Sequence, residues 1–181
     1  STTSSPIRAA AVSALPPVGG NYAPDMIWEH FRIIGEATDL PLYLYHLPQI
    51  YGEVITIGKF VDALDKMPTL AGAKFSSYRI DDMIHLKLKA GGRLNILSGC
   101  GEQLLSAMAC GAEGSICTWY NLIPRLGNKI IECVKQSNIP EAIRHEDILV
   151  KYAMIVIKKH IGSLKWLVGL RGIDVGCPRM P

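Results

Sequence analysis

Lys74 is the residue in this sequence best placed to do covalent chemistry. It lies in the apolar run Thr69–Ser77 (TLAGAKFSS), which predicts a strand over residues 71–76 with Gly72, Lys74 and Ser76 on one face. A lysine held in so apolar a strand is suited to act as an amine nucleophile. The alternative is a lysine at a strand end with its ammonium group in water, because lysine is seldom fully buried.

Tyr45 is the group best placed to assist Lys74. The apolar run Leu40–His46 (LPLYLYH) predicts a strand with Tyr43 and Tyr45 on one face and with Leu42, Leu44 and His46 on the other. Neighbouring strands lie ~4.8 Å apart, so the Tyr45 phenol and the Lys74 amine could approach each other. The alternative is a core tyrosine whose hydroxyl is satisfied by hydrogen bonding.

Further polar groups follow the next two predicted strands, Leu94–Ser98 and Gly114–Thr118. In a parallel sheet they would meet Tyr45 and Lys74 at the carboxyl ends of the strands, where barrel enzymes build active sites. These candidates are Gly99, Gly101, Glu102 and Thr118. Glu102 could instead open a helix, and Ser76 and Thr118 could be ordinary strand residues. The histidines lack the spacing of metal ligands, so we expect no metal site.

The elements that position these residues alternate between strand-like and helix-like patterns, which is typical of an α/β fold built of βα units. Pro24 suits a helix start, with Ile27, Phe31 and Ile34 on one face, and the sequence turns wholly helical from about Ile123. The other predictions are a weak strand over 9–14 and helices over 57–64, 78–90 and 104–108. Five βα units followed by helices suggest an incomplete (β/α)₈ TIM-type barrel, which needs eight strands and ~250 residues.

Composition favours an ordinary globular protein. The 181 residues are 49% hydrophobic and carry a net charge of +3 that is spread along the chain, so we expect one domain over 1–181 and neither nucleic-acid nor membrane partners. Five cysteines without a CxxC pair favour a reducing, cytoplasmic setting. Residues 1–6 are expected to be disordered. The absent initiator Met fits either processing or a truncated reading, and the missing βα units favour an N-terminally truncated barrel.

Several segments together resemble the N-acetylneuraminate lyases of the dihydrodipicolinate synthase superfamily. The segments occur in the order expected of these lyases and with compatible spacing, and the resemblance runs from about residue 7 to the end. They are Tyr43–Pro48 (YLYHLP), Ala73–Ser76 (AKFS), Gly99–Ser106 (GCGEQLLS), Tyr120-Asn121 and the ending Gly172–Pro181 (GIDVGCPRMP).

The resemblance implies reversible aldol cleavage of N-acetylneuraminate to N-acetylmannosamine and pyruvate through a Schiff base, with no separate cofactor. It places the Schiff base on Lys74, the proton relay on Tyr45, and substrate-binding positions at Ser76, Gly99, Gly101, Glu102 and Thr118. It also implies a homotetramer. A dihydrodipicolinate synthase activity is less favoured, because Ile50 stands where those enzymes usually carry an arginine.

The sequence also departs from the lyase pattern. The Gly-Thr-Thr-Gly-Glu motif that holds the pyruvate carboxylate in the lyases is absent from the 181 residues. Gly101 stands where the lyases usually carry an aspartate, and Trp119 adds bulk beside Thr118. The alternative function is therefore a weakly active or inactive lyase-like protein with a scaffold or oligomerisation role.

Overall fold

The computed structural model describes residues 9–20, 22–52, 55–157 and 160–179. The chain forms two compact units, Ser1–Leu97 and Ser98–Pro181, and each is described by itself. The disorder expected over residues 1–6 lies outside the described residues. The expectation of a single domain over 1–181 stays a prediction.

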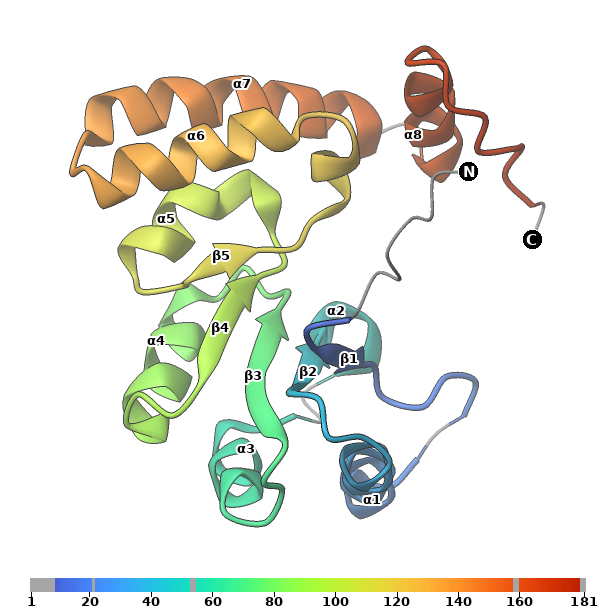
Figure 1. Ribbon diagram of the computed structural model, residues 1–181, viewed down its shortest axis with the longest axis vertical. Coiled ribbons are helices and arrows are strands. Elements are labelled where there is room, and N and C mark those ends of the chain that lie inside the picture. The colour runs from blue at the N-terminus through green and yellow to red at the C-terminus, as the bar shows by residue number, and fades with distance from the viewer. Residues whose placement is uncertain (1–8, 21, 53–54, 158–159, 180–181) are drawn as a thin grey trace, which may run out of the picture. The chain divides into compact units, whose positions relative to one another are not determined.

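The first unit is a parallel sheet whose strands follow one another in chain order, with helices between them (Figure 1). This is the predicted βα pattern. The strands are β1 (Val12–Ala14), β2 (Leu42–His46), β3 (Leu70–Phe75) and β4 (Asn95–Ser98), the last of which ends on the first residue of the second unit. The helices are α1 (Pro24–Glu36), the short α2 (Pro48–Tyr51), α3 (Ile57–Leu64) and α4 (Ile80–Ala90).

Helix α1 forms as its sequence predicts. Pro24 occupies the first turn, where its missing N–H costs nothing, and Ile27 and Phe31 are buried one turn apart. On the exposed side, the Arg32 guanidinium donates hydrogen bonds to Glu29 and Glu36, one turn before and one turn after it. Such surface pairs contribute only about 0.2–0.5 kcal/mol each, so burial of the apolar face is what holds α1 against the sheet.

Strand β2 shows the predicted alternation. Leu42, Leu44 and His46 are buried, while Tyr43 and Tyr45 are half-buried on the opposite face. Strand β3 covers Leu70–Phe75 and so begins one residue earlier than predicted, leaving Ser76 just beyond its end. A register irregularity lies at the start of the β2–β3 pairing, between Leu42 and Tyr43.

The second unit is mainly helical. Its helices are α5 (Leu104–Ala109), α6 (Pro124–Lys135), α7 (Ile139–Ile157) and α8 (His160–Gly169), with two short 3₁₀ helices, η1 (Gly101–Gln103) and η2 (Thr118–Asn121). Helices α6 and α7 lie side by side (Figure 1). Leu104, Ile130 and Leu149, from α5, α6 and α7, form a fully buried cluster.

Helix α5 is only six residues long, and α7 supplies its cap. Glu146 Oε1 accepts a hydrogen bond of 2.6 Å from the backbone N–H of Leu105 in the first turn of α5. Isolated helices this short are unstable in water, so the cap and the buried cluster hold α5 in place. Burial raises the pKa of the Glu146 carboxyl, and the Leu105 N–H partly offsets that shift.

The predicted fifth strand is wrong in extent. Strand β5 covers only Gly114–Ser115, and Thr118 opens the 3₁₀ helix η2 instead of ending a strand. The physical reason is that one carbonyl, that of Ser98, accepts both the Ile116 N–H (2.9 Å) and the Ser115 hydroxyl (2.8 Å). The chain then turns, as the hydrogen bond from Tyr120 N–H to Cys117 C=O shows.

Candidate active site

Lys74 and Tyr45 lie opposite each other on the two central strands of the first unit, where the β2–β3 register pairs their Cα atoms. The Lys74 Nζ lies 3.8 Å from the centroid of the Tyr45 ring. The predicted approach of the two groups is therefore confirmed. This contact is a cation–π interaction with the ring face, a type of contact worth about 0.5–2 kcal/mol.

Gly72 lies on the same face of the sheet as Lys74, at a position with no room for a side chain. A Cβ atom at Gly72 would lie 2.3 Å from the Asn95 carbonyl oxygen and 2.4 Å from a ring carbon of Tyr43. Both distances are far below van der Waals contact, so only glycine fits here. Tyr43 therefore packs over Gly72 in the same way that Tyr45 meets Lys74 one step further along the strands.

His46 and Phe75 support the site from the opposite face. Their rings lie 4.6 Å apart, directly after Tyr45 and Lys74 in the chain. Burial lowers the pKa of His46 to about 4, with a smaller opposing effect from the Asp82 carboxylate. The imidazole is therefore neutral near pH 7 and acts as a core side chain that fixes the ends of β2 and β3.

Ser76 is buried just past the end of β3, with only 4% of its surface exposed. Its backbone N–H donates to the His46 carbonyl at 2.8 Å, which continues the strand pairing by one step. Its hydroxyl has no hydrogen-bond partner among the described residues. A buried hydroxyl without a partner is uncommon, and it leaves Ser76 Oγ available to a ligand.

Glu102 lies in η1 of the second unit, and Trp119 of η2 contacts it. The Trp119 indole N–H donates a hydrogen bond of 3.2 Å to Glu102 Oε2. The sequence leaves Glu102 two roles, to bind substrate or to open a helix. The carboxylate that caps the first turn of α5 is that of Glu146 and not that of Glu102. The hydrogen bond from Trp119 orients the Glu102 carboxylate toward the η2 turn.

Gly101 is tightly enclosed by the same segment. A Cβ atom at this position would lie 2.8 Å from Cys117 Sγ, 2.9 Å from Cys117 Cβ and 3.0 Å from Trp119 Cδ1. Gly99 is half-buried in the same loop, and Thr118 is exposed, with its carbonyl accepting from the Asn121 side chain. From the sequence, Trp119 is only added bulk beside Thr118, because no local pattern reveals its contact with Glu102 across seventeen residues.

The predicted residues thus fall into two groups. The structure brings Tyr45 and Lys74 into contact in the first unit, with Ser76 two residues beyond Lys74. In the second unit it gathers Gly101 and Glu102 around Trp119, and Thr118 is the residue before that tryptophan.

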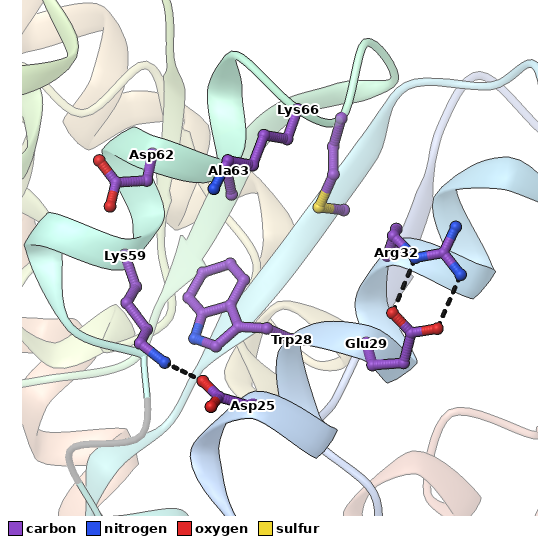
Figure 2. Close-up of a pocket in the computed structure, with 9 residues that line it drawn as sticks. Asp25, Trp28, Glu29, Arg32, Lys59, Asp62, Ala63 and Lys66 are labelled. Atoms are coloured by element: carbon purple, nitrogen blue, oxygen red, sulfur yellow. Dashed lines mark hydrogen bonds and ion pairs between the residues drawn. The ribbon is translucent and has the colours of Figure 1, made fainter.

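A separate cavity of the first unit lies away from these residues. It has a volume of about 280 Å³, it lies between α1 and α3, and none of the predicted site residues lines it. Figure 2 shows the Trp28 indole within it, with ion pairs between Lys59 and Asp25 and between Arg32 and Glu29. The Trp28 indole N–H is buried and has no partner among the described residues.

No group of three or more metal-ligating side chains occurs in the described parts of the chain. All five cysteines are free thiols. Across those same residues, no helix is long and apolar enough to cross a membrane.

Comparison with known proteins gives this arrangement a class. A putative dihydrodipicolinate synthetase from Pseudomonas aeruginosa superposes with a TM-score of 0.88 at 26% identity, over 96% of this chain and 60% of that structure. The N-acetylneuraminate lyase from Mycoplasma synoviae gives 0.82 at 24%, over 95% of this chain and 57% of that structure. The fold is α/β of the (β/α)₈ barrel type, and the chain covers part of such a barrel.

Sequence comparison agrees with the structural one. The model of the dihydrodipicolinate synthetase family matches residues 4–181, and the chain belongs to this family. Curated relatives include N-acetylneuraminate lyases from Sus scrofa (32% identical) and Gallus gallus (29%), each aligned over 83% of this chain. A 4-hydroxy-tetrahydrodipicolinate synthase from Prosthecochloris aestuarii is 25% identical over 96% of the chain.

The chain spans about half the length of the curated lyases that it matches. Class I aldolases of this family hold pyruvate as a covalent Schiff base and use no metal cofactor. Lyases and synthases both occur among the relatives, so the family alone does not select a substrate.

Proposed function

We propose that the protein is a Schiff-base aldolase that cleaves N-acetylneuraminate reversibly to N-acetylmannosamine and pyruvate. The observation that carries this proposal is the contact between Lys74 Nζ and the Tyr45 ring at paired strand positions. The predominance of N-acetylneuraminate lyases among the most similar curated relatives supports this substrate over that of a synthase.

Lys74 is the nucleophile in this proposal. Its neutral amine adds to the ketone carbon of the open-chain sugar acid, and loss of water gives an iminium ion. The adjacent bond between the third and fourth carbons then breaks, and its electron pair moves into the iminium to form an enamine. Protonation of the enamine and hydrolysis release pyruvate and regenerate the amine, so atoms and charge balance.

Tyr45 is the proton relay. As the carbon–carbon bond breaks, the hydroxyl on the fourth carbon loses its proton and becomes the aldehyde of N-acetylmannosamine. Because the Lys74 side chain lies on the Tyr45 ring, a substrate bound to the lysine would lie next to the phenol. General acid–base assistance of this kind contributes about 10²–10⁴-fold in rate.

The remaining predicted residues bind substrate. The partnerless hydroxyl of Ser76 is available to the sugar acid, and the Glu102 carboxylate, oriented by Trp119, accepts from sugar hydroxyls. Gly99, Gly101 and Thr118 contribute backbone groups and a hydroxyl. By the same family resemblance we expect a cytoplasmic homotetramer, and sialic acid and pyruvate as the small-molecule partners.

Trapping the Schiff base tests the proposal directly. Incubation with pyruvate and borohydride should add a reduced pyruvyl group to one peptide, the one that contains Lys74, as read by mass spectrometry. Lys74→Arg should abolish the adduct, whereas Lys66→Arg, which changes an exposed lysine, should not. An unmodified Lys74 in folded protein would contradict the Schiff-base function.

A further inference from the structure

A basic groove in the second unit has no role in the proposed aldolase chemistry. Its volume is about 740 Å³, within the range of ~300–1,000 Å³ that is usual for small-molecule sites. Residues of α6 and α7, with others just before α6 and just after α8, line it: Leu122, Ile123, Pro124, Arg125, Leu126, Lys129, His145, Ile148 and Arg171.

The charges on the groove all have one sign. Arg125 and Lys129 lie one turn apart on α6, and Arg171 follows the end of α8. No aspartate or glutamate of the described residues lines the groove. His145 also lines the groove, and its Nε2 is 3.5 Å from the Glu141 carboxylate, which does not line it.

The stability of α6 does not explain why Arg125 and Lys129 occupy these positions. Arg125 lies in the first turn of α6, where the helix dipole favours acidic side chains, and that turn contains none. Like charges one turn apart, as in Arg125 and Lys129, also disfavour a helix. The same groups are favourable once an anion binds, since the amino terminus of α6 and the three cations all attract negative charge.

The rest of the lining is apolar. Leu122 is buried, and Ile123, Leu126 and Ile148 contribute further apolar surface to the groove. Ile148 is 44% exposed. A ligand that fits both parts carries a negative group for the cations and an apolar body for the isoleucine and leucine side chains.

We propose that this groove is a binding site for a small organic anion with an apolar body, such as an aryl or alkyl carboxylate, sulfonate or phosphate. Charge complementarity selects the anion, and the enclosed volume selects a molecule of metabolite size. The site consists of residues of the second unit alone, and it does not depend on the proposed aldolase function.

The test uses two dyes that differ by one sulfonate group, anionic anilinonaphthalene sulfonate and neutral N-phenylnaphthylamine, in fluorescence titrations of the whole chain. The sulfonate should bind at one saturable site and weaken as salt rises. Arg125→Ala, Lys129→Ala and Arg171→Ala should each weaken sulfonate binding about tenfold, because each removes a charge-assisted contact, while the neutral dye changes less than about twofold.

Lys135→Ala is the matched control, because Lys135 is an exposed cation of the same helix that does not line the groove. Circular dichroism would establish that every variant is folded, and the salt titration of the unaltered protein tests the charge requirement without any substitution. The proposal is overturned if Lys135→Ala weakens the sulfonate as much as the groove variants do. It is equally overturned if the neutral dye binds as tightly, or if sedimentation shows that self-association of the chain excludes the sulfonate.

Discussion

The two units hold their predicted site residues by different means. In the first unit, Tyr45 and Lys74 meet because backbone hydrogen bonds fix the register of β2 against β3. In the second unit, Glu102 is oriented by a side chain, the Trp119 indole, and both residues lie in 3₁₀ turns. Backbone pairing tolerates little change, whereas a side-chain contact can be altered alone. We therefore expect the first unit to determine whether the protein reacts and the second to determine what it binds.

The largest effect should come from Tyr45→Phe. Removing the proton relay should lower the rate of aldol cleavage about 10²–10⁴-fold. Borohydride trapping of pyruvate on Lys74 should continue, because the aromatic ring under the amine remains. Steady-state kinetics and trapping on the same preparation measure both. Loss of trapping together with cleavage would show that the hydroxyl, and not the ring alone, positions the lysine.

Substituting one glycine in each unit would compare how rigid the two units are. Gly72→Ala would force a methyl group against the Asn95 carbonyl, which is backbone, and should lower the free energy of unfolding by about 3 kcal/mol or more. Gly101→Ala meets the Cys117 and Trp119 side chains, which can shift, and should cost about 1–2 kcal/mol.

Urea denaturation would measure both values. Adding Cys117→Gly should recover part of the loss in Gly101→Ala, because the two closest contacts are with the Cys117 side chain. No second substitution can relieve Gly72→Ala in this way, because the atom that its methyl group meets is the Asn95 backbone carbonyl oxygen. Equal costs at the two glycines would argue against a difference in rigidity.

His46 should make the stability depend on pH. Its pKa is lowered from 6.5 to about 4, so between these values the unfolded chain binds the proton and the folded chain does not. The contribution of neutral His46 to the free energy of unfolding is fully present above pH 6.5. It is lost as pH falls toward 4, by about 3 kcal/mol in total.

Urea midpoints measured across this pH range would test the linkage. His46→Phe should remove that part of the slope. Asp82→Asn should steepen it, because the Asp82 carboxylate partly opposes the lowering of the His46 pKa by burial. A slope unchanged in His46→Phe would assign the acid loss to other groups.

The smallest effect should come from Trp119→Phe. This change removes the hydrogen bond to Glu102, which is worth about 1.5 kcal/mol, the low end of the range for a charged acceptor. KM for the sugar should rise about tenfold, with kcat and pyruvate trapping little changed. A fall in kcat instead would mean that the second unit also takes part in the reaction.

The same difference explains what the sequence could predict. The alternation in Leu42–His46 predicts both the strand and its faces, and with the family resemblance it places Tyr45 beside Lys74. The fifth strand was predicted too long, since the pattern through Thr118 does not show that the Ser98 carbonyl ends the pairing at Ile116. The contact of Trp119 with Glu102 could not be predicted, because it joins two turns that have no periodicity.

The cap that Glu146 gives to α5 also has a consequence for how the chain is made. The amide that it caps, Leu105, precedes it by 41 residues, so α5 lacks its cap until α7 has been synthesised and has docked. The η1 turn that carries Glu102 leads directly into α5, so we expect it to order late. A ribosome-bound chain that ends before residue 146 should therefore show a protected β2–β3 pair and an exchanging Glu102 segment.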